Sequence, residues 1–250
     1  MNQHTRKIGF AGLARAWFGR NRKERMSPKA ELVKQISATD FTEAIDLMAC
    51  LAVLREGESL ILPRTLEAAN ATRAAIIVQR ALLQRVLMTV ERAFAPANRP
   101  KSDRHARVAF KHLSDPNIFD EVAKAGSRKH LQQACDAWRK YDADSRRKKL
   151  KHYRDKVVAH TGERDPAVPQ PLVSELTSYA MGTADALARL ARGTGVVDEL
   201  QLKVQMAAYD ESAKAFWSVW RDRMKSRKVA FSAGGGGGGR PPEKRSWGRI

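Results

Sequence analysis

The chain has 250 residues, 43% of them hydrophobic, and its 46 basic and 27 acidic residues give a formal net charge of +19. This length and hydrophobic content exclude a wholly disordered chain, and fit one domain with appendages or two small domains. No apolar run approaches the roughly 18–20 residues of a transmembrane helix, so no membrane span is expected. Cys50 and Cys135 lie among apolar neighbours, which predicts buried free thiols and a reducing, cytoplasmic location.

The positive charge is concentrated at the two ends of the chain. Residues 1–29 carry eight basic residues and one acidic residue, and residues 221–250 carry nine basic and two acidic ones. Such segments are typical of proteins that bind a polyanion, with nucleic acid favoured over an acidic membrane surface; a solubilising tail has the same composition. We predict a basic arm at 1–29, a helical domain at 30–230, and a glycine-rich linker with a basic disordered tail at 231–250.

Two helices are predicted in the first part of the helical domain. The first spans 38–57, with Asp40 as its N-cap and Gly57 as its stop. The second follows Pro63 and spans 64–94. Its polar residues fall on one narrow stripe, and the rest of its surface is largely apolar, which predicts a central helix covered on most sides. The stripe consists of Arg73, Arg80, Gln84 and Glu91.

The remainder of the domain also shows helical periodicity. A turn is predicted at 115–117, Ser127 is placed as an N-cap, and the polar segment 142–147 separates two helical runs. The predicted helices span 103–113, 128–141, about 150–161, 174–193 and 196–225. No segment alternates as a β-strand would, so we predict an all-α fold, a bundle of antiparallel helical hairpins.

The densest positive charge inside the domain lies at residues 146–156, with the sequence RRKKLKHYRDK. It holds seven basic residues and the single acidic Asp155. A solvated helix face has this composition, but a run of this density also attracts a phosphate backbone. The residues that we expect to bind RNA are Arg146, Arg147, Lys148, Lys149, Lys151 and Lys156.

Arg154 and His160 follow this run at the expected end of the same helix. If the helix continues to about Thr161 and Gly162 stops it, His160 lies in the last turn, where the helix dipole favours its protonated form. In an α-helix Arg154 then lies roughly 9 Å away along the axis and about 120° around it. The two side chains of one chain are therefore not adjacent, and a second copy of the helix would complete a site. We expect a homodimer through this helix.

The segment 153–160, YRDKVVAH, resembles the Arg-x4–6-His motif of HEPN-domain ribonucleases, and is most similar to that of the AbiU-like abortive-infection HEPN proteins. The resemblance implies a HEPN-like four-helix bundle core with additional helices, which dimerises so that two motifs face one cleft. It also implies a metal-independent endoribonuclease that needs no cofactor and uses the ribose 2′-OH as nucleophile.

The same resemblance implies roles for three residues. His160 would be the general acid or base, Arg154 would hold the scissile phosphate, and Asp155 would orient one of them or contact the ribose. The biological role implied is a phage-defence or toxin effector, with an antitoxin or other regulatory partner. HEPN toxins silenced by nucleotidylation carry a tyrosine shortly after the histidine; the sequence TGERD stands there instead, which puts that regulation in doubt.

Two alternatives remain open on the sequence. One is a non-catalytic helical bundle whose basic segments hold RNA or DNA. The other is an interaction bundle in which Arg154 pairs with a carboxylate and His160 only caps helix carbonyls. The scattered histidines and the two cysteines do not form a zinc-ligand pattern, so no metal site is expected.

Overall fold

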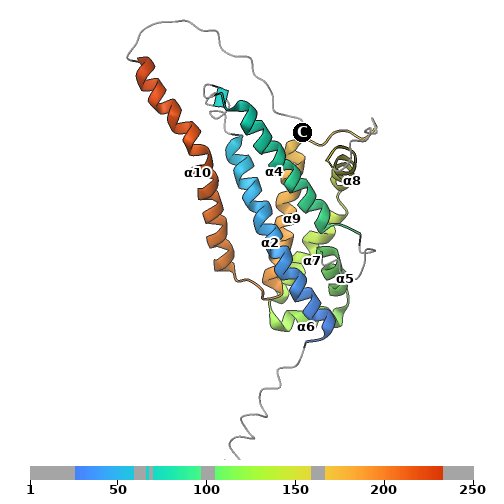
Figure 1. The fold of residues 1–250 in the computed structure, drawn as a ribbon. Coiled ribbons are helices and arrows are strands. Elements are labelled where there is room, and N and C mark those ends of the chain that lie inside the picture. The colour runs from blue at the N-terminus through green and yellow to red at the C-terminus, as the bar shows by residue number, and fades with distance from the viewer. Residues whose placement is uncertain (1–25, 59–65, 68–69, 97–104, 159–166, 233–250) are drawn as a thin grey trace, which may run out of the picture.

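The computed structural model describes residues 26–58, 66–67, 70–96, 105–158 and 167–232. These residues form eight α-helices and one π-helical turn, and none of them is in a strand (Figure 1). The prediction of an all-α fold is confirmed. Helix α2 begins at Pro28 and α10 ends at Ser232. Residues 1–25 and 233–250 lie outside the described residues, so the basic arm and tail stay predictions.

Four helices form the core of the bundle: α2 (Pro28–Gly57), α4 (Thr72–Ala93), α7 (Arg128–Asp142) and α9 (Val173–Gly193). Helix α9 packs against α7, α2 and α4, and α2 also packs against α4. The short helices α5 (Ala106–Leu113) and α6 (Pro116–Ala125) lie against α2 at the end where it begins (Figure 1). The long helix α10 (Glu199–Ser232) runs along α2 on the outside of this core (Figure 1).

Helix α2 begins ten residues before the predicted start. The Oγ atom of its N-cap Ser27 accepts a hydrogen bond from the Ala30 amide at 3.3 Å, and Pro28 occupies the first helical turn. The prediction that Asp40 caps the helix is wrong: Asp40 lies in mid-helix and is buried, and this burial raises its pKa to about 8. Gly57 is the last residue of α2, as predicted.

Helix α4 is shorter and less central than predicted. It begins at Thr72, two residues after Asn70, whose φ of 55° is incompatible with a continuous right-handed helix. The Ile77 side chain is 63% exposed and Met88 is 43% exposed, so one apolar part of the helix faces solvent. The central position belongs to α9, which buries small residues along much of its length.

The middle of the chain follows the predicted order with one added helix. The predicted turn at 115–117 begins helix α6, because the Asp115 carboxylate accepts the Asn117 amide hydrogen bond as an N-cap. Ser127 does begin α7, but its side chain makes no cap; its amide bonds to the Gly193 carbonyl at 2.9 Å. Helix α7 ends at Asp142 and α8 (Arg146–Tyr153) follows, which confirms the predicted break.

An aromatic cluster joins α4, α5, α7 and α9 at the centre of the bundle. The Trp138 ring stacks on both Phe94 and Phe110, with ring centroids 4.2 and 4.5 Å apart, and the Tyr179 hydroxyl donates to the Tyr141 carbonyl at 2.7 Å. Cys135 lies buried beside this cluster, whereas Cys50 is only half-buried; both are free thiols. Among the described residues no helix is both long and apolar enough to cross a bilayer.

Candidate functional site

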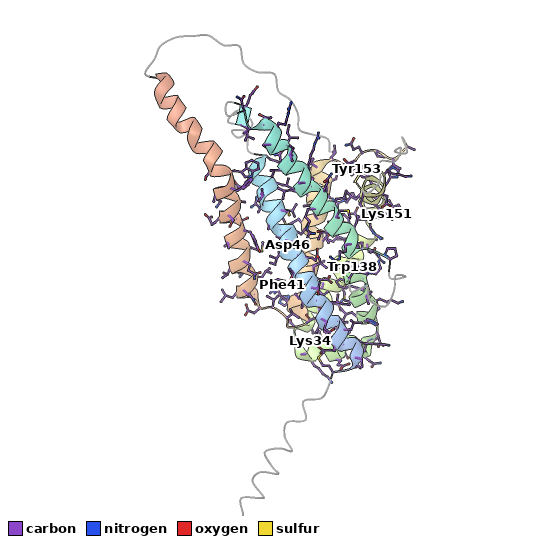
Figure 2. All side chains as sticks on the ribbon, viewed as in Figure 1. Lys34, Phe41, Asp46, Trp138, Lys151 and Tyr153 are labelled. Carbon is purple, nitrogen blue, oxygen red and sulfur yellow. The ribbon has the colours of Figure 1, made fainter. Side chains whose placement is uncertain are left out.

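The candidate site lies where α8 passes into the π-helical turn η1 (Arg154–Val158). The buried Leu150 and Tyr153 fix α8 to the bundle, and α8 and η1 contact α4. Figure 2 labels Lys151 and Tyr153 on this helix, beside α4. A π-helical turn is uncommon and is frequently found at functional sites. The turn begins at Arg154, the first residue of the predicted motif, and helical periodicity gave no sign of it.

Arg154 is held in a partly enclosed position. Its side chain is 23% exposed, and its Nη2 atom forms an ion pair with the Asp155 carboxylate and lies 4.0 Å from Oε2 of Glu91. The Nε atom is buried and has no hydrogen-bond partner among the described residues. A guanidinium has five N–H donors in a planar fork, and both ion pairs of Arg154 use Nη2, so its other terminal nitrogen is not engaged in an ion pair among the described residues.

Glu91 projects from α4 toward Arg154 and is almost completely buried, with 4% of its surface exposed. Burial raises the pKa of its carboxyl group to about 7, although Arg154, Arg147 and Lys151 act in the opposite direction. Its Oε1 atom has no hydrogen-bond partner among the described residues. The sequence placed Glu91 on the polar stripe of its helix but did not assign it to the site.

Asp155 lies between two cations. Its carboxylate accepts a hydrogen bond from Nζ of Lys151 at 2.5 Å and pairs with the neighbouring Arg154. Burial by itself would raise the pKa of Asp155, but these two cations outweigh it and hold the pKa below its usual value. Asp155 is therefore ionised at neutral pH, and it partly neutralises the guanidinium that it orients.

Most of the predicted RNA-binding cations of α8 already have partners within the protein. Arg146 pairs with Asp144 at 2.6 Å, Lys149 with Glu175 at 2.7 Å, and Lys151 with Asp155. Such pairs reduce the charge available to a phosphate backbone.

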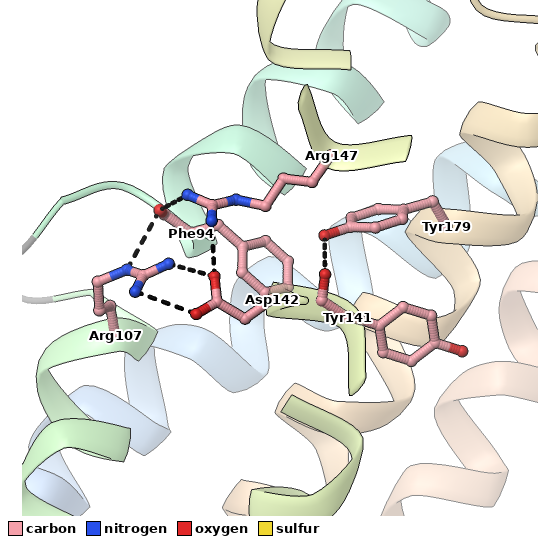
Figure 3. Close-up of polar contacts among 6 residues, drawn as sticks. All are labelled: Phe94, Arg107, Tyr141, Asp142, Arg147 and Tyr179. Carbon is pink, nitrogen blue, oxygen red and sulfur yellow. Dashed lines mark hydrogen bonds and ion pairs between the residues drawn. The ribbon is translucent and has the colours of Figure 1, made fainter. Parts of the chain in front are cut away.

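Arg147 has two partners. It donates to Asp142 at 2.7 Å and to the Phe94 carbonyl at 2.9 Å (Figure 3). Lys148 and Lys156 are exposed, and neither forms an ion pair within the described part of the chain.

The structure does not describe every residue of the predicted site. His160, Thr161 and Gly162 lie outside the described residues, so the distance between Arg154 and His160 and the predicted helix end are not tested. In the described parts of the chain, no three histidine, cysteine, aspartate or glutamate side chains are grouped as metal ligands would be. Arg154 and Asp155 form an ion pair, and Glu91 of α4 lies beside them, while their proposed roles stay predictions.

Comparison with known proteins gives a match to a family model. The family model for AbiU2, a HEPN family, matches residues 29–222, which cover α2 through most of α10 and include the Arg154–His160 motif. No curated protein matches the chain, and no solved structure matches it. The matched region spans more than three quarters of the sequence and all of the helical core. The chain therefore belongs to the AbiU2 family of HEPN proteins.

Proposed function

We propose that this protein is a metal-independent HEPN endoribonuclease in which Arg154 binds the scissile phosphate and His160 transfers protons. The observation that carries the proposal is the state of Arg154: it is oriented by Asp155, lies beside the buried Glu91, and has donor capacity left for an anion. Membership of the AbiU2 family supports the same assignment.

The proposed reaction needs only groups of the protein and the RNA. A general base removes the proton of the ribose 2′-OH, the 2′-oxygen attacks the adjacent phosphorus, and the bond to the 5′-oxygen breaks. The leaving oxygen takes a proton from a general acid, and the products are a 2′,3′-cyclic phosphate and a free 5′-hydroxyl. His160 serves one or both proton transfers, and the Arg154 guanidinium stabilises the charge that develops on the phosphate.

We further propose that two copies of the chain face each other through the helix that carries Arg154 and His160. If α8 and η1 were continued as helix, the two side chains of one chain would not be adjacent, and the partner's copy would complete the site. In the cell we expect a cytoplasmic effector of phage defence or toxin type, held inactive by an antitoxin or another regulatory partner. The family to which the chain belongs is consistent with this role.

The test is cleavage of single-stranded RNA by purified protein in excess EDTA. Arg154→Ala and His160→Ala should each reduce the cleavage rate at least about 100-fold, the usual loss when one acid–base or charge-stabilising group is removed. Matched controls are Arg128→Ala, an exposed arginine paired with Asp120, and His130→Ala, which contacts Arg192. Undiminished cleavage by both site variants would contradict the proposal.

The competing interpretation is a structural role for Arg154 in a non-catalytic bundle, and the ion pair with Asp155 is the observation that favours it. The two interpretations predict different melting temperatures for Arg154→Ala. A structural Arg154 predicts a melting temperature several degrees lower for Arg154→Ala, with no cleavage by the wild type. A catalytic Arg154 predicts a nearly unchanged melting temperature and lost cleavage.

A further inference from the structure

A cleft of about 520 Å³ lies between α5, α7 and α8, next to the end of α4. Its walls combine four basic side chains, one carboxylate and a set of apolar side chains. The basic residues are Arg107, Lys111, Arg139 and Arg147, the carboxylate is Asp142, and the apolar residues are Pro96, Phe110, Leu113, Cys135 and Trp138. We call it the α5–α7 cleft.

More basic than acidic side chains line the α5–α7 cleft. Asp142 is shared by Arg107 and Arg147, and both arginines also donate to the Phe94 carbonyl, so one carboxylate faces two guanidinium groups (Figure 3). Lys111 is exposed and forms no ion pair within the described residues. Among the described residues Arg139 forms an ion pair only with Asp136, an exposed residue of the same helix, and such a pair contributes little in water. The cleft therefore retains positive charge that a phosphate group would neutralise.

The apolar part of the α5–α7 cleft is built on stacked aromatic rings. Trp138 is stacked between ring systems of α4 and α5, and Arg107 lies over the Trp138 ring at 5.9 Å. Side chains that are already fixed lose little conformational entropy when a ligand binds. A cleft with fixed apolar walls and a basic rim fits a ligand with an apolar planar part and an anionic part, as a nucleotide has.

The α5–α7 cleft also adjoins the candidate catalytic site. Arg147 lines the cleft, and Arg154 is seven residues further along α8, roughly 10 Å along the helix axis and on nearly the same face. Both arginines reach the end of α4, where Arg147 donates to the Phe94 carbonyl and Arg154 lies beside Glu91. A strand whose phosphate lies at Arg154 can thus extend along α8 toward the cleft.

We propose that the α5–α7 cleft binds a nucleotide of the RNA strand that flanks the phosphate held by Arg154. This inference rests on the proposed ribonuclease function and adds a substrate-binding subsite to it. The base contacts the apolar walls, and the phosphate lies at Lys111 and Arg139 on the rim. Trp138 is already stacked on Phe94 and Phe110, so the base does not stack on the faces of its ring.

The test is the affinity of the full chain for a short single-stranded 2′-O-methyl RNA, which lacks the nucleophile and stays intact. In Lys111→Gln/Arg139→Gln we expect binding weaker by at least fivefold, and a salt dependence of the affinity that is flatter by roughly 0.7 per lost phosphate contact. The matched control is Lys124→Gln/Lys129→Gln, which removes two exposed charges outside the cleft. Melting temperatures establish that both variants are folded.

Equal affinity and equal salt slope in the cleft variant and the control would overturn the subsite, and the ribonuclease proposal would still stand if Arg154→Ala abolished cleavage. A selective loss of affinity without any cleavage by the wild type would support the cleft as a nucleic-acid site and reject the ribonuclease. A free mononucleotide that binds in a Lys111-dependent way, with RNA binding unaffected, would overturn the RNA assignment of the cleft.

Discussion

Glu91 and Arg154 face each other at the end of α4, and their proximity makes the site sensitive to pH. Glu91 is buried with a pKa raised to about 7, so near neutral pH its carboxyl group changes charge beside the guanidinium. When Glu91 is ionised it attracts the Arg154 guanidinium, and when it is protonated this attraction is lost and the ion pair of Arg154 with Asp155 remains. The charge of Glu91 therefore depends on the residues of η1 and α8 that pack against α4 as well as on its own helix.

The substitution Glu91→Gln tests this burial through stability. A carboxyl group with a raised folded-state pKa contributes fully to stability below its unfolded pKa of about 4.5, and that contribution is lost as pH rises toward 7. The unfolding free energy of Glu91→Gln relative to wild type should therefore increase between these pH values, by up to about 3 kcal/mol, and then level off. Denaturant unfolding at a series of pH values measures the difference.

The exposed Glu58 supplies the control for this experiment. Glu58→Gln should show a difference from wild type that is small and nearly constant over the same pH range. Asp40, whose pKa is raised to about 8, adds its own pH dependence to every variant, and the subtraction of wild type cancels it. A flat difference for Glu91→Gln would mean that Glu91 ionises as an exposed carboxyl group does.

The basic residues of α8 are of two kinds: some are bonded to other helices, and some are exposed at the surface. Arg147 is bonded to Asp142 and to the Phe94 carbonyl, and thereby connects α8 to α7 and α4. The next residue, Lys148, is exposed and forms no ion pair within the described residues. Four adjacent basic residues in the sequence thus contribute differently to stability and to the surface charge.

Arg147→Gln and Lys148→Gln form a matched pair of adjacent substitutions on α8. Arg147→Gln should lower the unfolding free energy by about 2 kcal/mol, since hydrogen bonds to charged groups contribute roughly 1.5–3 kcal/mol and their loss leaves Asp142 with fewer partners. Lys148→Gln should change it by less than about 0.5 kcal/mol. In RNA binding, Lys148→Gln should flatten the salt dependence by roughly 0.7 if Lys148 contacts a phosphate.

At the scale of the whole molecule, α10 is attached to the core through α2. Trp217 is 1% exposed, its Nε1 atom donates to the Val53 carbonyl at 2.9 Å, and its ring lies against Gly57 at the end of α2. Arg55 pairs with Asp210 at 2.7 Å along the same seam. The family match extends to residue 222, so the matched region includes this part of α10.

Trp217→Ala should cost about 3–5 kcal/mol of unfolding free energy, the range for removal of a fully buried aromatic side chain. The neighbouring Phe216 is 48% exposed, and Phe216→Ala should cost less than about 1 kcal/mol. Thermal unfolding of both variants measures the contrast. A Trp217→Ala protein as stable as Phe216→Ala would show that α10 is not part of the cooperative unit.

Sequence periodicity alone was enough to predict an all-α bundle, because a helix that packs on one side repeats its apolar residues about every 3.6 positions. Residue types, rather than periodicity, located the α7–α8 break and the end of α2 at Gly57. Caps were predicted less well: Asp40 has the residue type of an N-cap but lies buried within α2, since Ser27 and Pro28 begin the helix earlier.

Only the tertiary structure decided which charged residues form ion pairs within the described part of the chain. Lys149 and Glu175, or Arg147 and the Phe94 carbonyl, are far apart in the chain, and no local pattern predicts that they meet. The burial of Glu91 could not be predicted locally either. Arg73, Arg80 and Gln84 lie on the same polar stripe of α4 and are exposed, whereas Glu91 is buried in the part of the chain where η1 and α8 contact α4. Periodicity gives the polarity of each helix face, whereas burial and pKa depend on the segment that packs against that face.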